Sequence, residues 1–318
     1  MANMNDISFI GIGNMGWGMA LNVRRKMPKN ATLFIHDINL DACERFKKVA
    51  AEEVKSGSVE IVKTSKEAAE SANTVISIVP ASKHVKAVYL TPGSGVIAAS
   101  PSDKRLILEC STIDSETTRE VGKALMDAGI GTYVDTPVSG GTGGAAAGIL
   151  AFMLGCFETD SFATRVKDNV AMMGDPKKTF CCGKLGTGLA AKISNNYLSG
   201  CFNLAIAQSM AIGIRQGVDP KVLHEVIKAS SGMSWMGTNK QPVPGIDPKF
   251  PSSNDYKPGF RVELMIKDLT LGSNSGKAVG INPTMADTAL ETYHKANEDD
   301  RCRDRDLTSV YLYVNDVK

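Results

Sequence analysis

Histidine and tryptophan are scarce in this chain, whose 318 residues include four histidines and two tryptophans. The histidines are isolated from one another and from clustered carboxylates, at His36, His84, His224 and His294. No CxxC pair occurs, and no histidine has zinc-finger spacing. These absences argue against a metal site, because bound metals need clustered histidine, cysteine or carboxylate ligands.

A charge imbalance and long apolar runs are also missing. The formal net charge is only +2, which gives no reason to expect binding to nucleic acid or to a membrane surface. Polar residues or glycine interrupt the apolar stretches before about 18 residues accumulate, so no membrane-spanning helix is predicted. The first predicted strand begins about five residues into the chain, so no targeting segment is expected.

The seven cysteines are an odd number, which argues against a disulfide framework. Most lie in apolar sequence surroundings, and we interpret them as reduced core residues of an intracellular protein. Cys181 and Cys182 are adjacent, but a disulfide between neighbours in the chain would be strained. A structural role is therefore favoured over a redox role for this pair.

The length of the chain predicts two domains of about 150 residues each. The first begins with an apolar strand over residues 6–12, which runs into Gly11-Ile-Gly13-Asn14-Met15-Gly16 and a helix over residues 17–25. Strand, glycine turn and helix in this order form a dinucleotide-binding fingerprint. Gly11 would permit the tight turn, Gly13 would let the backbone approach a pyrophosphate, and Gly16 would let the helix pack on the strand. The free amides of the helix start would face the phosphates.

An acidic residue follows at the expected distance. Asp37 comes directly after the second predicted strand, residues 32–36, and stands 21 residues after Gly16. A carboxylate there accepts hydrogen bonds from the adenine ribose hydroxyls and repels a 2′-phosphate, and no arginine follows immediately, so NAD is favoured over NADP. Asp37 could instead be the N-cap of a helix over residues 40–51, a role that Asn39 could also serve.

The alternation of apolar strands and helices continues to residue 170. Strands without polar alternation are typical of a parallel sheet covered by helices on both faces. Ligands of such sheets bind beyond the carboxyl ends of the strands. Strands are predicted at 74–79, 105–110, 131–135 and 150–154, helices at 66–71, 83–89, 115–128 and 159–170, and a short extended segment at 179–181.

Three strand ends are small or polar, and we expect them to line the ligand site: Val79-Pro80-Ala81, Cys110-Ser111-Thr112 and the segment 135–141. In the last of these, Ser139, Gly140 and Gly141 offer a hydroxyl and consecutive backbone N–H groups that suit the carboxylate of a substrate. The alternative is a plain glycine-rich turn. The glycines and alanines of residues 142–148 predict a flexible segment.

A long apolar run over residues 186–216 predicts a single helix with a polar patch near its start. Gly188, Lys192, Asn195 and Asn196 are spaced so that a helix places them on one face. The apolar residues around them indicate burial on several sides. Lys192 is therefore either a lysine that extends from the helix end to the surface or a buried amine that transfers a proton.

Only helices are predicted after residue 181. Gly217, Asp219 and Pro220 form a helix stop followed by a new helix start. Helices are predicted at 221–229, 262–276, 284–295 and 307–314. The segment 232–259 is longer than a loop that only connects two helices of a compact domain. We interpret it as the lining of a substrate site, with Ser231 and Trp235 as contacts, or as a mobile lid.

Four segments together resemble the signatures of the β-hydroxyacid dehydrogenase family, over nearly the whole chain. They are Gly11 to Asn22, Asp135 to Gly141, Gly188 to Asn196 and Lys267-Asp268-Leu269. Segments similar to the 3-hydroxyisobutyrate dehydrogenase branch of this family are His36 to Cys43, Ser230 to Trp235, Pro242 to Gly245 and Tyr256 to Phe260. Thr136 departs from the signature, which usually has alanine at that position.

The resemblance implies an α/β Rossmann-type N-terminal domain over residues 1–184, an interdomain helix over 185–216 and an all-helical C-terminal domain over 217–318. It implies NAD-dependent oxidation of 3-hydroxyisobutyrate to methylmalonate semialdehyde, a step of valine catabolism, by hydride transfer with a catalytic lysine. It also implies a homo-oligomer, either a dimer or a tetramer. The protein would be cytoplasmic as the sequence is written, or in the mitochondrial matrix if a presequence has been removed.

Residue by residue, the resemblance implies that Lys192 is the catalytic lysine and that Asn196 orients the substrate. Ser139, Gly140 and Gly141 would hold the substrate carboxylate, and Trp235 would be a further substrate contact. Lys267 would lie beside the nicotinamide ribose. The other implied cofactor residues are Gly11, Gly13, Asn14, Met15, Gly16, Asp37, Val79, Pro80, His84 and Thr112.

Other functions stay open at this point. A related enzyme could act on 3-hydroxypropionate, tartronate semialdehyde or an imine. A phosphogluconate-type enzyme is disfavoured, because its basic phosphate-binding residues are absent and Ser194-Asn195-Asn196 stands where a His-Asn pair is expected. A protein that binds a dinucleotide without catalysis is disfavoured because Lys192 is present.

Overall fold

The structure is a computed structural model that describes residues 5–54 and 57–316. The chain forms two compact units, the first ending at Lys192 and the second beginning at Ile193. This division falls within one long helix, α8 (Thr187–Arg215). The predicted domain ranges include residues 1–4, 55–56 and 317–318, which lie outside the described residues.

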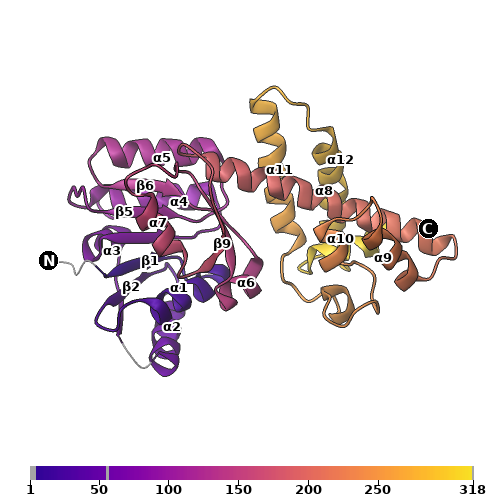
Figure 1. Ribbon diagram of the computed structural model, residues 1–318, viewed down its shortest axis with the longest axis horizontal. Helices are drawn as coiled ribbons and strands as arrows, with labels where there is room; N and C mark the ends of the chain where they lie inside the picture. The colour runs from indigo at the N-terminus through magenta and orange to yellow at the C-terminus, as the bar shows by residue number, and fades with distance from the viewer. Residues whose placement is uncertain (1–4, 55–56, 317–318) are drawn as a thin grey trace. The chain divides into compact units, whose positions relative to one another are not determined.

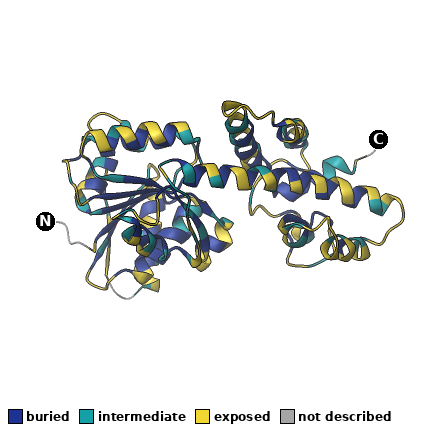
Figure 2. Ribbon diagram, turned by 45° about the horizontal axis from the view of Figure 1, so that its top comes forward, coloured by how far each residue is buried: buried dark blue, intermediate teal, exposed yellow. Residues whose placement is uncertain are grey.

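The first unit is built on a six-stranded parallel sheet with the strand order β3-β2-β1-β4-β5-β6. Helices pack against this sheet, and its central strands are buried (Figure 1, Figure 2). From β1 the chain adds β2 and β3 toward one edge of the sheet, and then returns to add β4, β5 and β6 toward the other edge. The switch point between β1 and β4 is where α/β sheets bind ligands. The strands are β1 (Ile7–Ile10), β2 (Thr32–His36), β3 (Ser58–Ile61), β4 (Thr74–Ser77), β5 (Leu106–Glu109) and β6 (Thr132–Asp135). The Rossmann-type prediction is confirmed.

The helices that connect these strands begin and end close to their predicted positions. They are α1 (Asn14–Lys26), α2 (Leu40–Glu53), α3 (Ser65–Ser71), α4 (Ser82–Leu90) and α5 (Ser115–Asp127). A 3-10 turn that was not predicted, η1 (Val96–Ala98), lies between α4 and β5. Asn39 is the N-cap of α2, since its side chain accepts a hydrogen bond from the Ala42 N–H. Asp37 is therefore not needed as a cap.

Strand β3 was not expected from the sequence. Its four residues alternate between exposed and buried positions at the edge of the sheet, where only one neighbouring strand pairs with it. Only Val59 and Ile61 of this strand are apolar, so it lacks the continuous apolar run that marks the other strands of the sheet.

A second, three-stranded sheet follows in the first unit. Its elements are β7 (Val138–Ser139), α6 (Gly141–Ala147), β8 (Leu150–Leu154), α7 (Ala163–Val170) and β9 (Gly174–Cys181). The prediction of a flexible segment at residues 142–148 is wrong, because α6 occupies it. Gly18 of α1 lacks a Cβ that would overlap α6, and the Asn22 amide donates to the Ala145 and Ala146 carbonyls at 2.8 and 3.0 Å. These contacts add side-chain donors to carbonyls in the last turn of α6, where the Ala145 carbonyl also accepts from the C-cap Gly148 N–H.

The second unit is helical, as predicted. Its elements after α8 are α9 (Pro220–Ala229), α10 (Trp235–Asn239), η2 (Pro251–Asn254), α11 (Val262–Ala278), α12 (Thr284–Glu298), η3 (Leu307–Ser309) and α13 (Val310–Val314). Gly217 has a φ of +94°, and the Asp219 side chain caps α9, which confirms the predicted stop and start. The core of this unit is formed by apolar residues of α8, α11 and α12, among them Leu204, Leu269 and Tyr293.

Within the described residues, α8 alone has the length and apolar character of a membrane-spanning helix, with a mean hydropathy of 1.3 over its most apolar window. Of that window, 44% is buried inside the structure. Exposed and buried residues alternate along α8 (Figure 2). Core helices of soluble proteins have the same length and composition.

Candidate active site

The glycine turn between β1 and α1 has the geometry that dinucleotide binding requires. Gly11 has a φ of +96°, and a Cβ there would overlap the Ile78 carbonyl oxygen. A Cβ at Gly16 would overlap the Gly11 carbonyl oxygen. Gly13, in contrast, has no atom within 4 Å of the place where a Cβ would stand, so a pyrophosphate has room to approach its backbone. The three glycines therefore serve three different steric needs, and the turn fits a dinucleotide.

Asp37 lies directly beside this turn. One carboxylate oxygen accepts a hydrogen bond from the Ile12 N–H at 2.6 Å, and the other accepts one from the Asn39 N–H at 2.8 Å. Each oxygen keeps a second lone pair that can accept a hydrogen bond from a ribose hydroxyl. The same side chain thus fixes the glycine turn and presents negative charge where a 2′-phosphate would have to bind.

The loops that follow β4 and β5 carry the other predicted cofactor residues of the first unit. The Val79 side chain lies beside Gly11, and the Val79 N–H donates to the Ser111 hydroxyl at 2.7 Å. Pro80 is exposed, and Thr112 is half-buried. His84 lies in the first turn of α4, where its Nδ1 is buried without a hydrogen-bond partner among the described residues.

The predicted substrate loop joins β7 to α6. Ser139 ends β7, while Gly140 and Gly141 have φ values of +141° and +63°, which side chains disfavour. Gly140 is the N-cap of α6, so the first unpaired amides of that helix follow Ser139 directly in the chain. This arrangement supports the predicted binding of a carboxylate.

A buried carboxylate fixes the start of α8. Asp135 is fully buried, and its two oxygens accept hydrogen bonds from the Gly186 N–H at 2.7 Å and the Leu189 N–H at 2.8 Å. Burial raises the pKa of Asp135, and these two hydrogen bonds counteract part of that increase. A Cβ at Gly155 or Gly188 would collide with Asp135, so both positions need glycine. Asp135 was predicted only as the first residue of a segment that lines the ligand site, and its structural role at α8 was not predicted.

The polar patch of α8 is only partly exposed. Lys192 and Asn196 are each 7% exposed and lie four residues apart, while Asn195 is exposed. The interpretation of Lys192 as a surface lysine is therefore wrong, and a buried amine is what the structure shows.

Asn196 is held by a residue that the sequence analysis quoted only as part of a motif. The Asn196 amide donates to Asp268 of α11 at 2.6 Å, and the Lys267 amine lies 3.1 Å from the other Asp268 oxygen. Asp268 is 3% exposed, so this carboxylate is shielded from water. Asp268 thereby fixes the orientation of Asn196.

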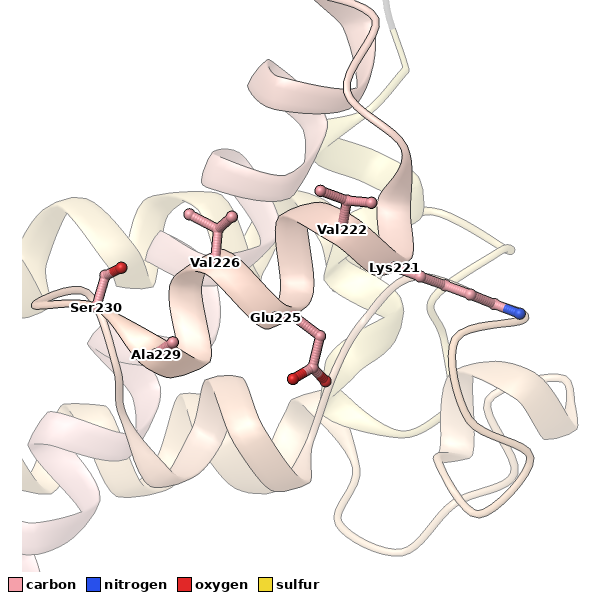
Figure 3. A pocket seen from close by; sticks show the side chains of 6 residues that line it. All are labelled: Lys221, Val222, Glu225, Val226, Ala229 and Ser230. Carbon is pink, nitrogen blue, oxygen red and sulfur yellow. The ribbon is translucent and has the colours of Figure 1, made fainter.

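Trp235 is the first residue of α10 and is 65% exposed. A shallow, open hollow along α9 is a different feature, with a volume of about 570 Å³ (Figure 3). Its lining comes from a single helix and the residue after it: Lys221, Val222, Glu225, Val226, Ala229 and Ser230. None of these is a predicted site residue, so we do not place the reaction there.

Two family models together match nearly all of the chain. Residues 6–185 match the NAD binding domain of 6-phosphogluconate dehydrogenase, and residues 186–314 match the NAD-binding domain of NADP-dependent 3-hydroxyisobutyrate dehydrogenase. The mitochondrial 3-hydroxyisobutyrate dehydrogenase of Mus musculus is 35% identical over 316 residues, which cover 99% of this chain and 89% of that protein. The chain belongs to the 3-hydroxyisobutyrate dehydrogenase family of β-hydroxyacid dehydrogenases.

Two further relatives of this β-hydroxyacid dehydrogenase bear on its substrate. The NAD-dependent L-serine dehydrogenase of Pseudomonas aeruginosa is 35% identical over 291 residues, 91% of each chain. The 3-hydroxyisobutyrate dehydrogenase of Mycobacterium tuberculosis, solved with L-serine, is 32% identical with a TM-score of 0.84 and covers 99% of this chain and 100% of that chain. The enzyme is an NAD-binding oxidoreductase.

Replacing Asp268 with alanine should lower kcat of this dehydrogenase about tenfold to a hundredfold, because Asn196 loses the acceptor that orients it. Asp268→Asn keeps an oxygen for Asn196 but loses the charge beside Lys267, so it should retain more activity than the alanine variant. Steady-state kinetics and NADH titration of both variants measure the effect. An alanine variant with wild-type kcat would contradict the role given to Asp268.

Proposed function

We propose that this β-hydroxyacid dehydrogenase uses NAD to oxidise 3-hydroxyisobutyrate to methylmalonate semialdehyde in valine catabolism. The observation that carries the proposal is the buried amine of Lys192 on α8, with Asn196 one turn later held by Asp268. The 3-hydroxyisobutyrate dehydrogenase of Mus musculus, similar over nearly the whole chain, supports this substrate. The carboxylate of Asp37 beside the glycine turn supports NAD over NADP.

NAD, when bound, supplies the acceptor for the hydride of the carbinol carbon. The turn of Gly11, Gly13 and Gly16 would hold its pyrophosphate. In oxidation, Lys192 would accept the proton of the substrate hydroxyl, and in reduction its ammonium would stabilise the alkoxide oxygen.

The other candidate residues position the substrate. Asn196 would hold the substrate hydroxyl. Ser139 and the amides that follow Gly140 would bind the carboxylate.

L-Serine is a second candidate substrate. It differs from 3-hydroxyisobutyrate only in having an ammonium group in place of the methyl group. The similarity to an NAD-dependent L-serine dehydrogenase and to a family member solved with L-serine favours it. The two substrates are distinguished by what surrounds that substituent, because an unpaired ammonium is costly to bury whereas a methyl group is not.

We expect turnover with NAD and one enantiomer of 3-hydroxyisobutyrate. With NAD as cofactor, kcat/KM for this acid should be at least about tenfold above that for L-serine. With this acid as substrate, kcat/KM for NAD should be at least about tenfold above that for NADP. The measurement is the absorbance of the reduced nucleotide, with both enantiomers, L-serine, 3-hydroxypropionate and glycerate tested against NAD and NADP. A higher kcat/KM for L-serine would replace the proposed substrate by the second candidate. No turnover on any of these acids, with NADH still bound, would contradict the proposed reaction.

The same proposal includes a homo-oligomer, either a dimer or a tetramer, inside the cell. An apolar stripe on α8 supports it, since Leu198, Phe202 and Ile212 are 50%, 40% and 59% exposed. Such side chains are commonly covered at subunit interfaces.

A further inference from the structure

The last residues of three neighbouring strands form a buried polar row at the carboxyl edge of the main sheet. Ser77 of β4 pairs in register with Glu109 of β5, which pairs with Asp135 of β6. All three are 0% exposed. Paired residues of parallel strands have side chains on the same face of a sheet, so the two carboxyl groups are neighbours. The Asp135 carboxyl fixes α8, which leaves Glu109 without an assigned role.

Glu109 is connected to the loop after β4 by a chain of hydrogen bonds. One Glu109 oxygen accepts from the Ser111 N–H at 2.9 Å and from the Ser77 hydroxyl at 3.4 Å. The Ser111 hydroxyl in turn accepts from the Val79 N–H at 2.7 Å. Ser111 is 1% exposed, so water does not compete for these bonds. The position of the Val79 backbone beside Gly11 is thereby tied to Glu109.

The surroundings of Glu109 favour its uncharged form. Its second oxygen is buried without a hydrogen-bond partner among the described residues. The titratable groups that face it are Asp135 of β6, the neighbouring Cys110, Tyr89 of α4 and Tyr133 of β6, and none of them is a cation. Arg119 of α5 acts on Asp135. Burial, together with the nearby Asp135, raises the pKa of Glu109 to about 8, although the hydrogen bonds from Ser111 and Ser77 lower it.

We propose that Glu109 is a positioning residue of the dinucleotide site, which acts through Ser111 on the Val79 backbone amide. It does so as the neutral acid. Ionisation would put a second negative charge beside Asp135 with no cation among the described groups that face it, and the repulsion between the two buried carboxylates would displace the Glu109 side chain from its place beside Ser111. The inference rests on the proposed function only in taking the loop of Val79 and Pro80 as part of the dinucleotide site.

The test is NADH binding without any hydroxy acid, measured by fluorescence titration of the full-length protein. Glu109→Ala and Ser111→Ala should each weaken NADH binding about tenfold, because each removes a link to the Val79 amide. The double variant should bind no more weakly than the weaker single variant, since both residues act along one chain. Glu109→Gln has the shape of the neutral acid and should bind NADH within about twofold of wild type at pH 7.

A matched control separates positioning from general destabilisation. Thr118 is 0% exposed and bonds with the Tyr133 hydroxyl at 3.1 Å, outside the chain from Glu109 to Val79. Thr118→Ala should leave NADH binding unchanged. Equal weakening by Thr118→Ala, or losses in the double variant that multiply those of the single variants, would overturn the proposal.

The pH dependence keeps the proposal testable even if the alanine variants do not fold. Wild type should bind NADH more weakly as the pH rises above about 8, whereas Glu109→Gln should show no such loss. Wild type should also lose thermal stability relative to Glu109→Gln between pH 5 and pH 9. The reason is that the acid ionises near the ordinary glutamate pKa of 4.5 in the unfolded chain, while in the folded chain it stays neutral up to about 8.

Identical pH profiles of NADH binding in wild type and Glu109→Gln would overturn the role of Glu109. The substrate panel is independent of this assay, because NADH binding is measured without substrate. A failure of the proposed reaction therefore leaves the test of Glu109 intact.

Discussion

Lys192→Met should lower kcat for oxidation of the hydroxy acid by about three orders of magnitude, while NADH binds within about twofold of wild type. Methionine is unbranched like lysine, only one atom shorter, and suits a position that is 7% exposed, so the substitution removes the amine with little change in packing. The loss should appear in kcat, because the amine acts on the proton that moves in the reaction. Steady-state kinetics and NADH titration measure the two quantities.

Two other variants sharpen this test. Lys192→Arg keeps the positive charge but replaces the amine by a guanidinium that does not release its proton, so its kcat should stay low. Recovery of activity by arginine would show that only a fixed charge is needed. Lys184→Met removes an exposed lysine just before α8 and should change neither kcat nor NADH binding. A methionine variant at Lys192 that keeps more than about a tenth of wild-type kcat would contradict general-base catalysis by this amine.

Asp135→Ala should lower the free energy of unfolding by about 2–5 kcal/mol, because the buried N–H groups of Gly186 and Leu189 lose their acceptor. Chemical denaturation followed by circular dichroism measures this change. Activity should fall as well, since the start of α8 places Lys192. Asp135→Asn keeps one acceptor oxygen and should cost less.

The control for Asp135 is Asp219, which accepts the same kind of hydrogen bonds from backbone N–H groups at the surface. Its side chain accepts hydrogen bonds from the Lys221 and Val222 N–H groups at 2.9 and 3.1 Å at the start of α9, but it is exposed. Water replaces Asp219 as the partner of these groups, so Asp219→Ala should cost only about 1 kcal/mol. Equal costs at the two positions would contradict the importance of burial at Asp135.

Much of the fold was predictable because its signals are local. The glycine turn, the N-cap of Asn39 and the stop and start at Gly217 and Asp219 depend on residues within one or two turns of one another. The strand and helix alternation follows from apolar periodicity, which the chain carries along its whole length. The same periodicity placed Lys192 and Asn196 on one face of a helix.

Local patterns in the sequence were therefore enough to predict the fold class, the dinucleotide turn, the long helix with its lysine, and the family. Contacts between distant parts of the chain bury Lys192, hold residues 141–147 as a helix, and give Asp135 and Asp268 their hydrogen-bond partners. They also bring Glu109 beside Ser77 and Asp135. The partners of Asp135 lie 51 and 54 residues away, and Asn196 lies 72 residues from Asp268. Asn22, which holds the end of α6, lies 123 residues from Ala145. Such contacts leave no trace in local spacing, because they exist only after the chain has folded and water has been excluded from between the partners.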